Sequence, residues 1–307
     1  MKIETTKISF KAKRIINKMK NESFKHKENQ IIKELKNYEY TPFNINDVEI
    51  DSNYNLEIIN FKNSKGYLLK HKQNLNNNEI VYVIHGGGYV LPLRATNFKS
   101  AYLYSKYNNN CDVLLIDYTV NLKFPHAIED VSEGYEYLLT KYENNNIIVA
   151  GHSAGGGLAL ALAFHIREKE LLKPRCFILA SPWLDLSCSG QSYLKNRIVD
   201  TVFGSLYSKP ESIIPNLYAD EEFINNEYAS PINGTFNDLS PILIITGSDE
   251  MVLSDSLSLE EKCSATNTFA KLYVYKGMWH DFYTKTDDFK EAKNAWLNIN
   301  QFIKNQS

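Results

Sequence analysis

The sequence predicts an α/β fold in which helices flank a mostly parallel β-sheet. From residue 80 onward, short apolar runs rich in β-branched residues alternate with longer stretches that have helical character, and this order is typical of parallel sheets. The chain has 307 residues, of which 43% are hydrophobic and 23% are charged. This length and composition favour one large soluble domain with additions over two domains of equal size.

The expected elements follow the apolar runs along the chain. The strands of the parallel sheet are expected at residues 80–84, 113–116, 147–150, 176–180, 242–245 and 272–275. The helices between and after them are expected at residues 95–107, 127–142, 158–169, 255–264 and 289–304. Earlier strand-like runs at residues 48–50, 56–61 and 66–71 are expected to form antiparallel edge strands.

Residues 1–42 are expected to form cap helices that precede a core at residues 43–307. The first helix carries one apolar stripe: Ile8, Ala12, Ile15, Ile16 and Met19. A second helix is expected at residues 29–38. A basic amphipathic helix can lie on a membrane, but packing against its own protein is the more common role. We therefore expect no stable membrane association.

A second cap segment is expected at about residues 186–230, between two strands of the core. This interval is too long for a plain crossover loop, and it contains aromatic residues and two prolines. Long insertions of this kind often form lids or binding elements. We expect short helices here that join residues 1–42 in a cap over the site described below.

Charge and targeting signals limit the function classes. The formal net charge of −2 gives no reason to expect nucleic acid as a partner. No run approaches the ~20 apolar residues of a transmembrane helix, and no secretory signal is visible, so we expect a cytoplasmic protein. The cysteines form no C-x-x-C pair and are expected to be free thiols. The sequence leaves open whether the chain forms a homodimer.

A serine nucleophile is indicated by residues 151–155, Gly-His-Ser-Ala-Gly. This G-x-S-x-G pattern lies between an expected strand and an expected helix. In that context the glycines allow a sharp turn that exposes the hydroxyl of Ser153 at the end of the strand.

A glycine turn, His-Gly-Gly-Gly-Tyr at residues 85–89, follows the expected strand at 80–84. Backbone amides in such a turn can point at an anion, and acyl transfer needs donors where the oxyanion develops. A glycine-rich turn without a chemical role and a phosphate-binding loop are the alternatives, but no Lys-Ser or Lys-Thr follows the glycines, as a phosphate-binding loop would require.

The serine requires a base and an acid that orients it. His280 follows the expected strand at 272–275 and is the best candidate for the base, and His126, in a loop after Pro125, is a weaker one. Asp249 follows the strand at 242–245 in the same way and is the candidate acid, with Glu250 or Asp255 as alternatives. The chain order Ser153, Asp249, His280 agrees with a nucleophile on a strand–turn–helix elbow.

Several motifs resemble those of the hormone-sensitive-lipase-like branch of the α/β-hydrolase superfamily, bacterial carboxylesterases in particular. They are HGGGY at 85–89, GHSAGG at 151–156, SPWLDLS at 181–187, YASP at 228–231, GSDEMVLSD at 247–255 and HDF at 280–282. The resemblance implies an α/β-hydrolase fold with an eight-stranded sheet and a helical cap. It also implies no metal or organic cofactor, and a small-molecule ester substrate with a short to medium acyl chain.

Position by position, the resemblance assigns roles to individual residues. Ser153 is the nucleophile, His280 the base and Asp249 the orienting acid. The implied oxyanion donors are the amides of Gly87, Gly88 and Ala154, and the implied cleft residues are Tyr89 and Trp183.

Two segments depart from the family pattern. His152 stands where the family usually has an acidic residue, and residues 117–123 read D-Y-T-V-N-L-K instead of D-Y-R-L-A-P-E. These two departures affect the surroundings of the site more than the triad. H-D-F at 280–282 resembles the family's H-G-F around the base.

The expected reaction is hydrolysis of a carboxylic ester through an acyl-enzyme. An amide or formamide hydrolase with the same triad is one alternative. A non-catalytic protein that binds a small ligand is another, although such proteins typically lack a triad residue.

Overall fold

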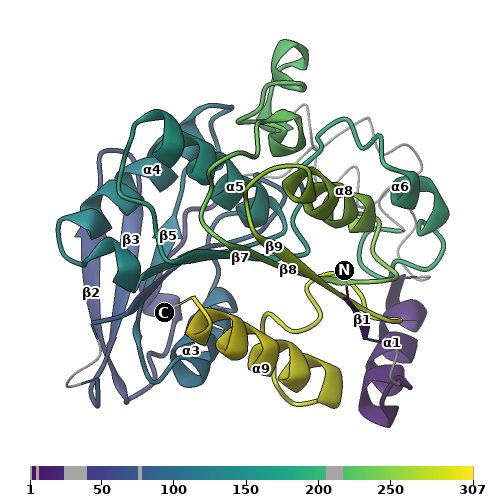
Figure 1. The fold of residues 1–307 in the computed structure, drawn as a ribbon. Coiled ribbons are helices and arrows are strands. Elements are labelled where there is room, and N and C mark those ends of the chain that lie inside the picture. Colours follow the sequence, from purple (N-terminus) through teal and green to yellow (C-terminus); the bar gives the residue numbers. More distant parts are fainter. Residues whose placement is uncertain (1, 5–6, 24–39, 75–77, 205–216, 307) are drawn as a thin grey trace.

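The computed structural model describes residues 2–4, 7–23, 40–74, 78–204 and 217–306. These residues form a sheet with the strand order β1-β9-β8-β7-β6-β4-β5-β3-β2 (Figure 1). The strands are β1 (Lys2–Glu4), β2 (Tyr54–Asn60), β3 (Lys65–His71), β4 (Ile80–Ile84), β5 (Asp112–Asp117), β6 (Ile147–His152), β7 (Cys176–Ala180), β8 (Ile242–Gly247) and β9 (Ala270–Tyr275). The α/β-hydrolase fold expected from the motifs is therefore confirmed.

Strands β4 to β9 run parallel, whereas β2 and β3 are antiparallel at one edge, as predicted. The opposite edge carries β1, which pairs in parallel with β9. The described sheet thus has nine strands, one more than the eight that the resemblance implies. The extra strand comes from the N-terminal segment, for which only helices were expected.

The predicted strand at residues 48–50 is wrong. A 3-10 turn, η1 (Ile45–Asp47), lies directly before these residues, and the side chain of Asn44 accepts a hydrogen bond from the amide of Asn46 at its start. Val48 and Ile50 then pack their partly buried side chains against the core without joining the sheet.

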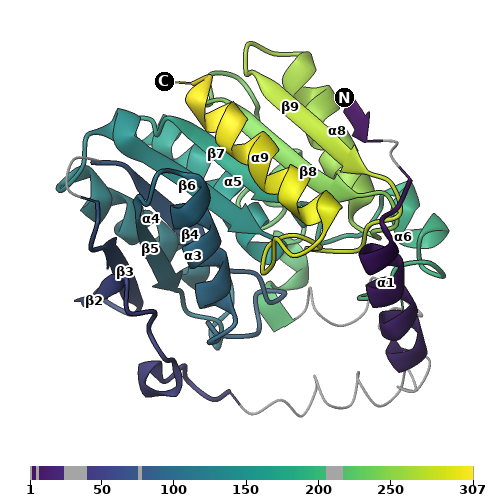
Figure 2. The same ribbon diagram turned by 90° about the horizontal axis from the view of Figure 1, so that it is seen from below.

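Helices cover both faces of the sheet. They are α3 (Asn97–Tyr107), α4 (His126–Leu139), α5 (Ala154–Glu168), α8 (Leu253–Ser264) and α9 (Lys290–Lys304). Figures 1 and 2 show α4, α5 and α8 on one face and α3 and α9 on the other. Each face is sealed by its own cluster of buried apolar side chains, because alternate strand residues point to opposite faces.

The N-terminal helix α1 (Phe10–Ser23) packs on its own protein, as predicted. Ala12 is fully buried, and Ile8, Ile15 and Ile16 lie against the core that also holds α9. The hydroxyl of Thr201 lies 3.9 Å from the sulfur of Met19, so α1 also contacts the second cap segment. The predicted helix at 29–38 lies outside the described residues. No helix in the described ranges is both long and apolar enough to cross a bilayer.

The insertion between β7 and β8 contains short helices, as expected. They include α6 (Gln191–Lys195), η4 (Glu221–Phe223) and η5 (Pro231–Asn233), and residues 205–216 lie outside the described part. The described stretch at 191–204 lies above the carboxyl ends of the parallel strands. It therefore contributes to the site directly.

Candidate active site

The backbone at Ser153 makes a strained turn between β6 and α5. Its φ of 54° and ψ of −124° are rare for a residue with a side chain. Gly151 and Gly155 make this turn possible, because a Cβ on either would lie 2.2 Å from a backbone oxygen. The amide of Ser153 donates to the carbonyl of Ala180 at 2.9 Å, which ties the turn to β7. Ser153 thus stands at the carboxyl edge of the sheet, as the G-x-S-x-G pattern predicts.

The glycine turn follows β4 and lies beside the serine. Gly87 and Gly88 adopt φ values of 136° and 63°, which favour glycine. A Cβ on Gly87 would also lie 2.8 Å from the carbonyl oxygen of Leu91. Within the described residues, the amides of Gly87, Gly88 and Ala154 have no hydrogen-bond acceptor. They remain available as donors to a substrate oxygen.

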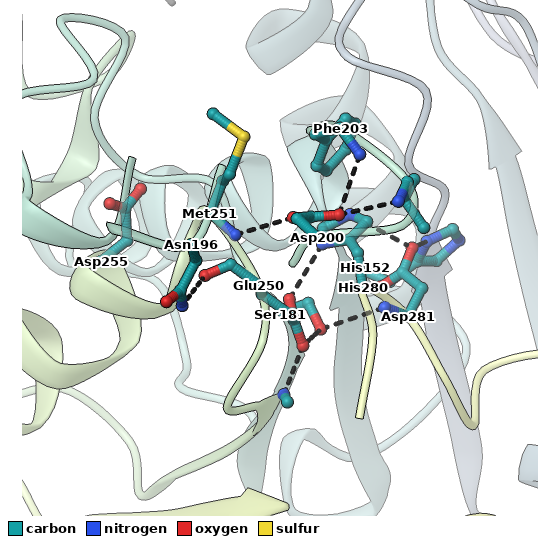
Figure 3. A network of polar contacts seen from close by, with 12 residues as sticks. His152, Ser181, Asn196, Asp200, Phe203, Glu250, Met251, Asp255, His280 and Asp281 are labelled. Carbon is teal, nitrogen blue, oxygen red and sulfur yellow. Dashed lines mark hydrogen bonds and ion pairs between the residues drawn. The ribbon is translucent and has the colours of Figure 1, made fainter. Parts of the chain in front are cut away.

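His280 is buried beside a carboxylate, but that carboxylate is Glu250. The Nδ1 of His280 lies 3.0 Å from Oε2 of Glu250, whose other oxygen accepts from the hydroxyl of Ser181 at 2.8 Å and from the amide of Gly247. Figure 3 shows Glu250 between Ser181 and His280. This arrangement holds the imidazole with Nδ1 toward the acid and leaves Nε2 for proton transfer.

The prediction that Asp249 orients His280 is contradicted by this geometry. The carboxylate of Asp249 accepts from the hydroxyl of Ser248 at 2.7 Å, and its amide donates to the carbonyl of Met278. Neighbouring residues in the tight loop after β8 point in different directions, so only one of the two adjacent carboxylates can face the histidine. That one is Glu250.

The loop between β8 and α8, residues 248–252, carries Asp249 and Glu250 and is called the acid loop below. Asp255, the other alternative, lies on the far side of this loop (Figure 3). Its carboxylate accepts from the amides of Leu184 and Asp185 and from the hydroxyl of Tyr193. Burial raises its pKa to about 8. Asp255 therefore braces the segment after β7.

The cap segment holds the acid loop in place, a role that sequence reasoning missed. Asn196 donates to the carbonyls of Ser248 and Glu250 at 2.9 and 2.8 Å. Asp200 accepts from the amide of Met251 at 2.7 Å and from the amides that follow it in the cap. Phe203 then places its ring 4.4 Å from that of His280. The segment after α6 thus holds the loop that carries Glu250 and covers the ring of His280.

A second histidine–carboxylate pair lies beside the first. The Nδ1 of His152 lies 2.9 Å from Oδ2 of Asp281, and its Nε2 accepts from the amide of Gly86 at 3.1 Å. The same carboxylate oxygen lies 3.7 Å from Nε2 of His280. The two residues that depart from the family pattern at this point, His152 and Asp281, are therefore partners of each other.

The carboxylates around His280 set its charge. Burial by itself would lower the pKa of the imidazole, but the negative charges of Asp281 and Glu250 outweigh it and raise the pKa to about 9. The charge of His280 in turn helps to hold the pKa of Asp281 below its usual value, although burial opposes this. These two carboxylates therefore favour the charged form of the His280 imidazole.

Two cavities meet at Ser153. The smaller one, of about 20 Å³, is lined by Trp183, Cys188, Tyr193, Phe203, Met251 and Val252 besides Gly88 and the serine. The larger one, of about 270 Å³, is lined by the glycine turn, His152, His280, Asp281, Arg94, Lys285 and apolar residues of the loop and cap. Ser153 and His280 therefore open onto the same space.

Of the two residues expected to line the cleft, Trp183 lines a cavity and Tyr89 does not. Trp183 lines the small cavity, and its indole nitrogen donates to the carbonyl of Asp185. Tyr89 is buried behind this wall, where its ring stacks on Tyr218 with centroids 3.9 Å apart. The prediction that Tyr89 lines the cleft is wrong. Its hydroxyl lies toward the carbonyl of Trp183, at 3.3 Å, so it supports Trp183 from behind.

Comparison with known proteins places the chain in a family. A family model described as alpha/beta hydrolase fold matches residues 80–284. This chain belongs to that family. The chain is 28% identical to an esterase of Acinetobacter venetianus over 227 residues, which span 73% of this chain and 74% of that protein. It is 27% identical to the esterase LipU of Mycobacterium tuberculosis over 230 residues, or 73% and 77% of the two chains.

A solved structure shares the architecture of this α/β hydrolase. A crystal structure of an esterase from the bacterial hormone-sensitive lipase family superposes with a TM-score of 0.82 and covers 98% of this chain and 99% of the other, at 24% identity. At this identity the likeness shows the fold. Together with the family match, it confirms the α/β-hydrolase fold that the motifs imply.

Proposed function

We propose that this α/β hydrolase is a serine carboxylesterase with Ser153, His280 and Glu250 as its catalytic residues. The observation that carries the proposal is the meeting of Ser153 and His280 on one cavity, beside amides that have no acceptor among the described residues. The esterases among its relatives support the same reaction class.

The first step forms the acyl-enzyme. The hydroxyl of Ser153 attacks the ester carbonyl while Nε2 of His280 takes its proton, and the carbonyl oxygen becomes negative. The amides of Gly87, Gly88 and Ala154 would donate to that oxygen, and each such donor contributes about 3 kcal/mol to lowering the barrier. Glu250 stabilises the imidazolium that forms.

The second half of the reaction uses the same groups. His280 returns its proton to the alcohol oxygen, and the alcohol leaves. A water molecule then attacks the acyl-enzyme as His280 takes its proton, which releases the carboxylic acid and restores Ser153. An acyl group on Ser153 would lie beside the small cavity, so short acyl chains are expected to react faster than medium ones.

The direct test is the Ser153→Ala variant with p-nitrophenyl acetate and butyrate. Turnover should fall by at least about 10⁴-fold, because no other group at the elbow can form the acyl-enzyme. Undiminished turnover would refute the assignment. Rates on a matched anilide, measured with the native protein, separate an esterase from an amide hydrolase.

A further inference from the structure

The two cavities can be assigned to the two halves of an ester, if the proposed function is correct. The alcohol oxygen receives its proton from His280, so the alcohol must lie on the side of the imidazole. His280 lines the large cavity but not the small one. The acyl group therefore enters the small cavity of about 20 Å³, and the alcohol occupies the large cavity of about 270 Å³.

The small cavity limits the size of the acyl group. Its volume corresponds to roughly one or two water-sized groups. Trp183 and Tyr193 are both buried at its wall and held by hydrogen bonds, which leaves them little freedom to move aside. The cavity therefore fits an acetyl group.

Two cations stand at the wall of the large cavity. Arg94 lies in the loop before α3, and Lys285 lies in the loop between β9 and α9. Throughout the described ranges, neither side chain forms an ion pair with a carboxylate. The carboxylate on this wall, Asp281, is bound to Nδ1 of His152 through Oδ2, whereas its Oδ1 has no hydrogen-bond partner in the part of the chain that the structure describes.

The electrostatics of this wall favour an anion. Partial desolvation and the positive charges of Arg94 and Lys99 lower the pKa of Lys285, although Asp281 opposes them. Cations that repel one another at the edge of a cavity gain from a negative ligand between them. Arginine in particular offers a planar pair of donors that matches a carboxylate or phosphate.

We propose that the alcohol half of the natural substrate carries an anionic group, a carboxylate or a phosphate, which Arg94 and Lys285 bind, and that the acyl half is acetyl. The substrate class is thus an acetate ester of an anionic alcohol. The apolar residues Val90, Leu91 and Val202 on the same cavity would cover the carbon skeleton between the ester and the anion.

The experiment compares three acetate esters: 4-acetoxybenzoate, its neutral methyl ester, and 4-acetoxyphenyl phosphate. They are assayed with the native protein and with the Arg94→Gln/Lys285→Gln double variant. The double variant should lose at least tenfold in kcat/KM on one or both anionic esters and at most about twofold on the neutral ester. Because each loss is the ratio of kcat/KM of the native protein to that of the variant on the same ester, the different intrinsic reactivities of the esters cancel. The anionic ester with the larger loss identifies a carboxylate or a phosphate as the preferred group.

The control is Lys293→Gln, which removes an exposed positive charge from α9, at a residue that lines neither cavity. This variant should keep kcat/KM on all three esters within about twofold of the native values. The loss of kcat/KM that the double variant shows on anionic esters should also become smaller as salt is raised to about 1 M, because salt screens exposed charges.

The results of these assays distinguish the anion site, the acetyl assignment and the esterase activity from one another. Equal losses on anionic and neutral esters, or no loss on either, would overturn the anion site while leaving the esterase intact. Faster turnover of neutral butyrate than of acetate would overturn the acetyl assignment. Failure of the native protein to hydrolyse any of these esters would instead count against the proposed function.

Discussion

The two histidine–carboxylate pairs at the carboxyl edge of the sheet have almost the same length, 3.0 Å for His280–Glu250 and 2.9 Å for His152–Asp281. They differ at the second ring nitrogen. In His152, Nε2 accepts from the amide of Gly86 at 3.1 Å, whereas Nε2 of His280, on the cavity beside Ser153, is approached by Oδ2 of Asp281 only at 3.7 Å. A histidine beside a carboxylate is therefore not enough for a base. What decides is whether the other nitrogen is left for the substrate.

The pairs also differ in what holds the carboxylate. Glu250 is fully buried and accepts from Ser181 and from the backbone of Gly247, so its position is set by the core. Asp281 lies at a backbone φ of 57° on the wall of the cavity, and one of its oxygens is shared between the two histidines. The first pair is a fixed support for catalysis. The second connects the glycine turn to the loop that bears the base.

Replacing each histidine in turn should give the largest contrast. His280→Ala should reduce kcat by about 10⁴-fold or more, because the serine loses its base. His152→Ala should reduce it by only about 10- to 100-fold, because the glycine turn loses its anchor but the base remains. Steady-state kinetics with p-nitrophenyl acetate measures both. Similar losses would break the distinction between the two pairs.

The two adjacent carboxylates of the acid loop give the next largest effect. Glu250→Gln keeps the shape of the side chain but removes the charge that orients and stabilises the imidazolium, so kcat should fall by about 10³-fold. Asp249→Asn is the matched control and should change kcat by less than about threefold. Circular dichroism should show both variants folded. If Asp249→Asn lost more kcat than Glu250→Gln, Asp249 would be the orienting acid, as expected from the sequence.

The hydrogen bond between His152 and Gly86 should have a smaller effect that can be isolated. In His152→Asn the amide can still donate to Asp281, but it is too short to accept from the amide of Gly86 as well. The variant should lose about threefold to tenfold in kcat with little change in KM, since the glycine turn acts on the transition state. A change in KM alone would mean that His152 contacts the substrate.

The smallest expected effect is a shift in pH dependence. The base works only when deprotonated, and the carboxylates of Asp281, Glu250 and Asp200 raise the pKa of His280 to about 9. The kcat/KM of the native protein should therefore rise from pH 6 to about pH 9. Asp281→Asn removes one of these charges, lowers the pKa of His280 and moves the rise to lower pH. The exposed-charge control Asp288→Asn should leave the profile unchanged, and an unshifted profile in Asp281→Asn would exclude this role for Asp281.

Much of the fold follows from local patterns. The strands β4 and β7 begin and end at the predicted residues, and α9 differs from its prediction by one residue. Such elements are predictable because a buried parallel strand needs an unbroken apolar run and a surface helix needs a repeating apolar face. The short strand β1 could not be predicted, because its three residues carry no such pattern and its pairing depends on the exposed edge of β9.

Some residues of the candidate site can likewise be predicted from local patterns, and others cannot. Ser153 and the glycine turn are visible in the sequence because their backbone conformations require glycines at fixed positions. The choice of Glu250 over Asp249 is not visible, because it depends on which way each side chain of a tight loop faces a histidine 30 residues later. One signal was present for the second pair. The family's acidic residue is lost at His152 while an acidic residue is gained at Asp281, and such opposite changes suggest contact.

By itself, the sequence determined the order of strands and helices from residue 80 onward, the elbow at Ser153, the glycine turn beside it and the histidine after the last strand. These depend on local requirements of backbone and burial that neighbouring residues satisfy. Only the tertiary structure decided which carboxylate orients His280, that His152 is held by Asp281, and that Arg94 and Lys285 share a cavity wall. Those contacts join side chains from distant loops, and packing of the whole sheet sets the direction in which each loop points.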